Sequence, residues 1–268
     1  MISKVIFVIF LQALIYSRGS VEASPVTRII DGSIAHHHQF PWHLSLQIVT
    51  STSTNLRYCG GSLISNQFVL TAASCLIDAT SVRIDMGSVL FLEPQFSQES
   101  TQFVSHSQFN EQFKTNNIGI IRLRSPISEY SNTLRAILIP GTQHAGDQYV
   151  GTQSYISGYG VYALGGNVLS NQLRFGLQTT LANEECQQSF DARYVQAGSI
   201  CARSNATQTV CHGDIGGPLV VQYGDTWMQI GIASTISANG CAGPTVYTRL
   251  TSYIDWIRTM TGISNDDV

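Results

Sequence analysis

Short runs of apolar residues, separated by polar loops, dominate this chain. Several runs have the length, the alternation or the fully apolar character of β-strands. They are Leu44–Val49, Ser62–Ile64, Phe68–Thr71, Ser81–Asp85, Ile118–Leu123, Pro218–Val221, Met228–Ile232 and Val246–Leu250. No internal repeat or proline-rich linker divides them. Their spacing predicts an all-β protein built as an antiparallel sandwich or barrel.

Thr251–Thr261 has helical periodicity instead. Its apolar side chains recur at i, i+3, i+4 and i+7, the spacing of one helix face: Tyr253, Trp256, Ile257 and Met260. Ser252, followed by Asp255, resembles a capping box with Asp in place of Glu. The pattern predicts a short C-terminal helix that packs on a β body.

The first residues are typical of a secretory signal peptide. Lys4 precedes a mostly apolar run, Val5–Tyr16, that is shorter than the roughly 20 residues of a membrane-spanning helix. Val21-Glu22-Ala23 offers small residues for signal-peptidase cleavage. We therefore expect a signal peptide over residues 1–23, a short propeptide over 24–28, and a secreted, extracellular protein with no membrane anchor.

Composition excludes several classes of protein. With 43% hydrophobic and 12% charged residues, the chain does not resemble a disordered protein. A net charge of −3 with only 14 Lys and Arg argues against binding to nucleic acid. A chain of 268 residues can bury a core of its own, so we expect a monomer.

The six cysteines form an even set, and an oxidising compartment favours disulfides. Six cysteines allow 15 connectivities, so spacing alone selects none. The sequence has no C-x-x-C motif and no Cys/His pair at zinc-finger spacing. We expect neither a metal nor a cofactor.

Several strings in fixed order carry the chemical information. They are Arg28–Gly32, Cys59–Ile64, Leu70–Cys75, Asn116–Leu123 and Cys211–Val220, followed by Val246–Arg249 and the helix. Together they resemble the chymotrypsin/trypsin family of serine proteases, and among these the arthropod chymotrypsin-like enzymes called brachyurins. The resemblance covers Ile29 to about Gly262, so we assign residues 29–268 to one domain of this kind.

The resemblance implies a fold of two six-stranded antiparallel β-barrels with a short C-terminal helix, and an active site in the cleft between them. It also implies three disulfides: Cys59–Cys75, Cys186–Cys201 and Cys211–Cys241. Each closes a loop whose constraint stabilises the folded chain by on the order of 3 kcal/mol in the chain-entropy model.

The catalytic triad of the family is absent at all three positions. The family's histidine position, just before the second cysteine of its T-A-A-H-C string, is Ser74. Its aspartate position is Asn117, and its nucleophilic serine position, in the G-D-S-G-G-P string, is Ile215. Because a serine hydroxyl needs a base and an orienting carboxylate, these residues predict an inactive homologue.

The specificity pocket also departs from the family. Its floor position is Thr209, which excludes trypsin-like selection of Arg and Lys. Ser234 begins the family's S-W-G string, whose tryptophan is Thr235 and whose glycine is Ile236 here. A second wall glycine corresponds to Thr245. Side chains at glycine positions are expected to fill the pocket.

Other family features are retained. Arg28 before Ile29 matches the family's activation cleavage site, and Asp214 matches the acceptor of the freed amino group. The pairing would order the cleft loops on processing; the alternative is an inherited scaffold without a switch. Gly213 stands at the oxyanion-hole position.

The histidines are the remaining candidates for a replacement catalyst. His36–His38 are adjacent, which suits a solvated loop better than a metal site; we place His43 on a strand near the surface and His212 at the cleft rim. No motif pairs any of them with a carboxylate or a hydroxyl. Asn205 lies in a glycosylation sequon.

These observations predict a secreted, non-catalytic serine protease homologue that binds macromolecules as a decoy, cofactor or competitor. The partners expected are extracellular proteins: proteases, protease inhibitors or protease substrates. Two alternatives stay open. One is a serine-type endopeptidase with non-standard machinery, and the other is a passive luminal protein without a specific partner.

Overall fold

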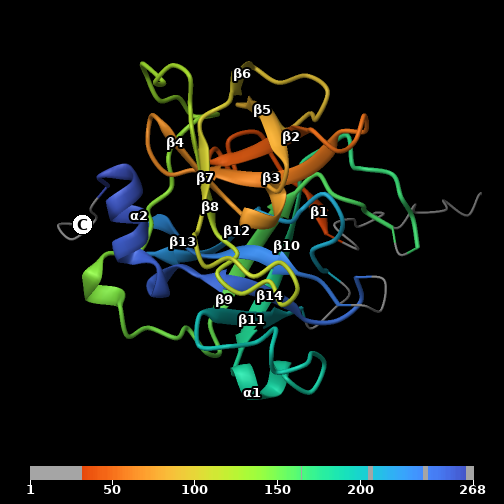
Figure 1. The fold of residues 1–268 in the computed structure, drawn as a ribbon, viewed down its shortest axis with the longest axis vertical. Helices are drawn as coiled ribbons and strands as arrows, with labels where there is room; N and C mark the ends of the chain where they lie inside the picture. The colour runs from red at the N-terminus through yellow and green to blue at the C-terminus, as the bar shows by residue number, and fades with distance from the viewer. Residues whose placement is uncertain (1–31, 164, 205–207, 238–240, 264–268) are drawn as a thin grey trace, which may run out of the picture.

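The computed structural model describes residues 32–163, 165–204, 208–237 and 241–263. Two antiparallel β-sheets, one from each half of the chain, pack against one another (Figure 1). The expected signal peptide and propeptide, with Arg28 and Ile29, lie outside the described residues, as does Asn205.

The N-terminal sheet has seven strands. In spatial order they are β6 (Phe96–Ser100), β5 (Ala79–Met86), β2 (His43–Thr50), β3 (Arg57–Leu63), β4 (Phe68–Thr71), β8 (Gly119–Arg122) and β7 (Phe103–Ser105). Only two residues separate β6 from β7, although these strands form the two ends of the sheet. The sheet is therefore curled into a half-barrel. Arg122 of β8 donates a backbone hydrogen bond to Gln102 in the break, at 2.8 Å.

The C-terminal sheet closes on itself. Its order is β1 (Ser33–Ile34), β10 (Arg174–Leu181), β11 (Ser199–Arg203), β14 (Thr245–Arg249), β13 (Thr226–Thr235), β12 (Pro218–Tyr223) and β9 (Gln153–Gly158). Because β9 also pairs with β10, the last six strands form a closed barrel to which β1 adds a short edge. The trypsin-like fold predicted by the resemblance is confirmed.

Helical segments are few and short in the described residues. They are α1 (Asn183–Cys186), α2 (Ile254–Thr261) and three single 3₁₀ turns, η1 (Ala73–Cys75), η2 (Thr142–His144) and η3 (Leu250–Ser252). No helix in this part of the chain is long and apolar enough to cross a membrane. Ile257 of α2 is 1% exposed and belongs to the same buried cluster as the apolar residues of β2 and β8. The C-terminal helix thus packs against the N-terminal half.

The observed helix α2 is shorter than the helix predicted over Thr251–Thr261. Leu250–Ser252 forms a 3₁₀ turn, and α2 begins after Tyr253 with no side-chain cap. The expected capping box is therefore wrong. Tyr253, which precedes the helix, instead donates its hydroxyl to Asn116 Oδ1 at 3.0 Å and is buried against the N-terminal half.

Candidate functional site

Three elements bring the vacated triad positions together between the two halves. Ser74 lies in η1, Asn117 comes two residues before β8, and Ile215 lies in the loop that leads to β12. Asn117 is fully buried and connects its neighbours through its side-chain amide. Its Oδ1 accepts a hydrogen bond from the Ser74 backbone N–H at 2.8 Å.

The other end of this amide donates twice. Asn117 Nδ2 bonds to Ser74 Oγ at 3.2 Å and to Ser234 Oγ at 2.9 Å. The amide therefore uses its acceptor and both of its N–H groups. A buried amide that is fully paired holds the Ser74 and Ser234 hydroxyls at fixed positions, because each unpaired group would cost about 1–3 kcal/mol.

Ile215 is held through its backbone. Its carbonyl accepts a hydrogen bond from the Gly60 N–H at 2.8 Å and lies 3.5 Å from Cys75 Sγ. The half-buried side chain packs against the main core cluster. Because it contains only carbon and hydrogen, it presents neither a nucleophile nor a proton donor.

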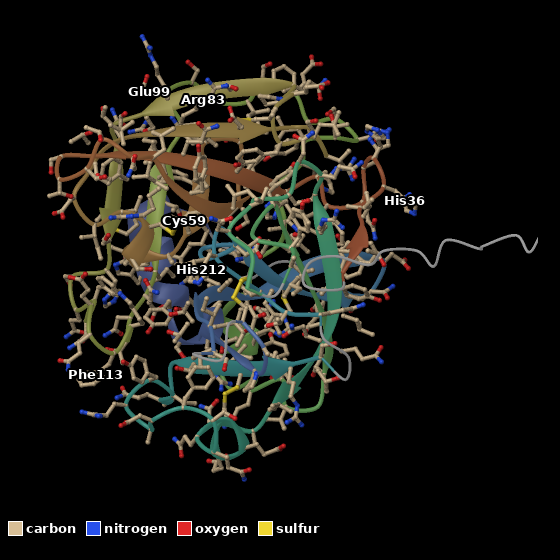
Figure 2. The ribbon with its side chains drawn as sticks, turned by 90° about the vertical axis from the view of Figure 1, so that its right-hand side faces the viewer. His36, Cys59, Arg83, Glu99, Phe113 and His212 are labelled. Carbon is tan, nitrogen blue, oxygen red and sulfur yellow. A yellow bond between two sulfur atoms is a disulfide. The ribbon has the colours of Figure 1, made fainter. Side chains whose placement is uncertain are left out.

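A cavity of about 540 Å³, here called the cleft cavity, lies beside these positions. Its lining includes Arg57, Ser74, Leu169, His212, Gly213 and Ile215. Figure 2 shows His212 near Cys59, in the region where the two halves meet. His212 is exposed, as expected of a residue at the rim.

Leu169 is a cleft residue that the sequence did not indicate. Gly213 has φ +97°, and a Cβ there would lie 2.7 Å from Leu169 Cδ2 and 3.0 Å from Gly160 Cα. Only glycine fits this position, on conformational and steric grounds. The leucine side chain lies against the backbone at the predicted oxyanion position, and it belongs to none of the sequence motifs.

The pocket positions Thr209, Ile236 and Thr245 lie outside the lining of the cleft cavity. Thr209 and Thr245 are both buried, with their hydroxyl oxygens 3.3 Å apart. Thr209 Oγ1 also lies 3.4 Å from the Gly243 carbonyl oxygen. Ile236 is half-buried and packs against Val161 and the Cys211–Cys241 disulfide. Methyl and hydroxyl groups thus occupy positions where the resemblance predicts bare glycine backbone.

Asp214 is buried beneath the loop that carries Gly213 and Ile215. Its carboxylate accepts backbone hydrogen bonds from Gly160 at 2.6 Å and from Cys211 at 3.1 Å. Burial raises the pKa of Asp214 to about 7, and the two N–H donors oppose the shift only in part. A Cβ on Gly160 would overlap the carboxylate. Its pairing with the Ile29 amino group stays a prediction.

His43 lies on a strand, but the expectation of a surface position is wrong. The side chain is buried between the halves, with Nδ1 at 3.0 Å from Ser157 Oγ and Nε2 without a partner among the described residues. Burial lowers the pKa of His43 to about 3, so the ring is neutral. His36–His38 are exposed.

The three disulfides implied by the resemblance are confirmed. Cys59–Cys75, Cys186–Cys201 and Cys211–Cys241 have Cα–Cα distances of 6.3, 6.0 and 5.3 Å. The first forms part of the cleft cavity lining, and the third supports Ile236. Two of the three bonds therefore border the cleft.

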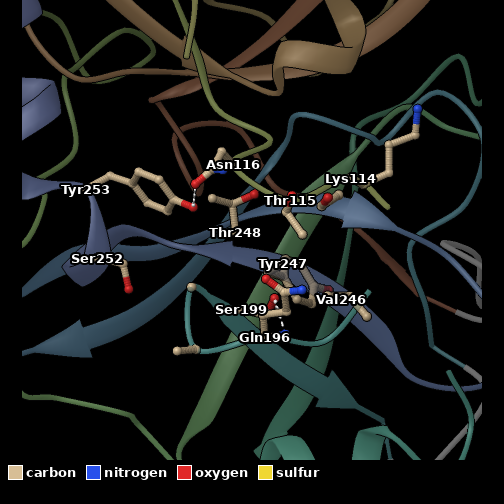
Figure 3. A pocket seen from close by; sticks show the side chains of 13 residues that line it. Lys114, Thr115, Asn116, Gln196, Ser199, Val246, Tyr247, Thr248, Ser252 and Tyr253 are labelled. Carbon is tan, nitrogen blue, oxygen red and sulfur yellow. Dashed lines mark hydrogen bonds between the residues drawn. The ribbon is translucent and has the colours of Figure 1, made fainter. Parts of the chain in front are cut away.

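Another cavity, of about 280 Å³, is lined by Asn116, which precedes Asn117 in the chain (Figure 3). Ser234, which bonds to Asn117, is among its lining residues. Thr248 Oγ1 donates to the Asn117 carbonyl at 2.8 Å, and Tyr253 bonds to Asn116 across the same space. No sequence motif indicates this cavity, because its lining comes from five separate segments of the chain.

The trypsin family profile matches residues 29–257. The chain belongs to the trypsin family. It is 32% identical to a collagenase of Hypoderma lineatum over 238 residues, 88% of each chain, and 33% identical to chymotrypsin-C of Rattus norvegicus over 242 residues, 86% and 88% of the two chains. A crystal structure titled HL collagenase superposes with a TM-score of 0.80 at 31% identity and covers 87% of this chain and 99% of that one.

Proposed function

We propose that this chain is a secreted, non-catalytic member of the trypsin family that acts by binding extracellular proteins. Its role would be that of a decoy, cofactor or competitor toward proteases, their inhibitors or their substrates. The observation that carries the proposal is the side chain of Ile215, which lies beside Gly213 and Ser74 where the family has its nucleophile.

The neighbouring groups support the same proposal. Asn117 donates to Ser74 Oγ through an amide nitrogen, which has no basic lone pair, so the pair contains no general base. In proteases of this family, asparagine in place of the aspartate lowers kcat by about 10⁴. In subtilisin, a serine protease of unrelated fold, removing the nucleophile or the base lowers kcat by roughly 10⁶. Loss of all three groups leaves no route to an acyl-enzyme at this site.

The test uses the secreted chain cleaved after Arg28. We expect no hydrolysis of fluorogenic peptides above background, and no labelling by a serine-directed phosphonylating reagent that modifies active chymotrypsin in parallel. Stoichiometric labelling of any serine in the cleft, identified by mass spectrometry, would refute the proposal.

An endopeptidase with unusual machinery is the second candidate. It is favoured by the names of the relatives, collagenase and chymotrypsin-C, and by the fact that Ser74 and His212 line one cavity. This candidate requires cleavage by the wild type that Ser74→Ala abolishes. Equal, background-level rates for both proteins exclude it.

A further inference from the structure

The cleft cavity combines apolar walls with positive charge. Val161, Leu169, Ile215 and the Cys59–Cys75 disulfide supply the apolar surface. Arg57 and His212 are the basic residues of the lining, and none of its described residues is acidic. Pockets of about 300–1,000 Å³ hold small ligands or protein side chains, and this cavity falls in that range.

Arg57 has donors left for a ligand. Its Nη1 lies 3.4, 3.1 and 2.9 Å from the carbonyl oxygens of Ser74, Cys75 and Ile77, which fixes the guanidinium in the cavity lining. Its Nε and Nη2 form no hydrogen bond, and no carboxylate pairs with it, within the described part of the chain. A guanidinium held in place without a counter-ion favours a carboxylate ligand.

The strand beside the cavity has a short free edge, which ends at Gly60 because the Gly60 N–H donates to the Ile215 carbonyl. β3 pairs with β2 from Arg57 to Ser62, but with β4 only at Ser62 and Leu63 among the described residues. Arg57, Tyr58 and Cys59 line the cavity at the unpaired part of this edge. An extended peptide can add to such an edge through backbone hydrogen bonds, while neighbouring pockets select its side chains.

We infer that the cleft cavity binds an extended segment of a partner protein, which inserts an apolar side chain over Ile215 and places a neighbouring carboxylate beside Arg57 and His212. The inference rests on the proposed function, and it assigns the chemistry of the partner. Thr209, Ile236 and Thr245 lie outside the cavity lining and do not contact the ligand in this assignment.

The first experiment uses blocked, fluorescent pentapeptides and fluorescence anisotropy. The probes carry leucine next to aspartate, in either order, between glycines; the controls replace leucine by serine, or aspartate by asparagine or lysine. We expect about tenfold weaker binding without leucine, because a buried leucine side chain is stabilising by more than one factor of ten. Without the carboxylate we expect a loss of about threefold that shrinks at high salt.

Variants then locate the site. Asn167 lines the cavity and is exposed. Asn167→Trp should therefore block the cavity and weaken the binding of the leucine–aspartate peptides at least tenfold. Val168→Trp makes the same change one residue later, at a side chain that is 61% exposed and outside the lining, and should leave binding unchanged. His212→Glu should reverse the preference between the aspartate and lysine peptides.

Equal binding of the leucine and serine peptides, no binding at millimolar concentration, or equal effects of Asn167→Trp and Val168→Trp would each overturn the inference. Mass spectrometry of the recovered peptides keeps the two proposals distinguishable. Intact peptides that bind elsewhere refute only this inference, whereas cleaved peptides refute the proposed function.

Discussion

Two sides of the predicted cleft, the pocket side with Thr209, Thr245 and Ile236 and the cavity side, differ in how far side chains fill the space. On the pocket side, Thr209 contacts Thr245 and Ile236 packs on the Cys211–Cys241 disulfide, at positions where the family resemblance predicts open space. On the cavity side, whose lining includes none of these three residues, a cavity of about 540 Å³ remains. A protease needs both sides to hold a substrate across the scissile bond, whereas a binding protein needs only one. Under the proposed function, loss of chemistry and loss of substrate access coincide, while one binding surface persists.

The largest expected effect concerns Asp214 and His43, two buried titratable groups. The unfolded chain releases the Asp214 proton near pH 3.8 and the folded chain near 7, so Asp214 makes folding less favourable as pH rises between them. Folding lowers the pKa of His43 from 6.5 to about 3. This group therefore acts in the opposite direction and makes folding less favourable as pH falls. Three pKa units correspond to about 4 kcal/mol, so the two contributions largely cancel between about pH 4 and 6.5.

His43→Gln should expose the Asp214 contribution. In urea unfolding, we expect the variant to lose about 4 kcal/mol of stability between pH 4 and 7.5 relative to the same interval in His43→Gln/Asp214→Asn. Cleavage after Arg28 should reduce this loss, if the Ile29 amino group then pairs with Asp214. A flat pH profile for the uncleaved single variant would contradict the assigned pKa of Asp214.

The next prediction restores the chemistry without the access. Ser74→His, Asn117→Asp and Ile215→Ser together return the family's triad, yet we expect little or no cleavage of chymotrypsin peptides. Adding Ile236→Gly and Thr245→Gly should raise kcat/KM by about 10² or more, because misplacing a substrate by about 1 Å costs that much.

The matched control for this series adds Val168→Gly to the triad variant, which should give no gain. Efficient cleavage of aromatic substrates by the triad variant alone would show that the filled side is in fact open, and the comparison between the two sides would fail.

The smallest effect concerns the amide that joins the two sides. Asn117→Leu leaves the Ser74 N–H and the Ser234 hydroxyl without this partner, so we expect a loss of about 1–3 kcal/mol in urea unfolding. Asn171→Leu, at an exposed asparagine, should change stability by less than about 0.5 kcal/mol. Similar losses in both variants would mean that the network does not hold the cleft together.

Strand prediction succeeded where the buried face is apolar. Phe68–Thr71 matches β4, and the runs near β2, β5 and β13 differ from the observed strands only at their ends. β10 was missed although its burial alternates, because its buried side chains are Arg174, Gln178 and Thr180. Gln178 is paired with the Gln208 carbonyl and the Tyr247 hydroxyl. A strand that buries paired polar groups has no hydrophobic period to detect.

The sequence alone determined the family, the disulfide pairing through the resemblance, and the absence of a nucleophile at position 215, because each depends on residue identity within a short string. Only the tertiary structure decided how the residues at the triad positions are buried and hydrogen-bonded. Asn117 bonds to Ser74 and Ser234, at sequence separations of 43 and 117 residues. His43 bonds to Ser157, at a separation of 114 residues. Whether such a polar group is buried and paired depends on which distant segments the fold brings against it, and local sequence patterns contain no information about that choice.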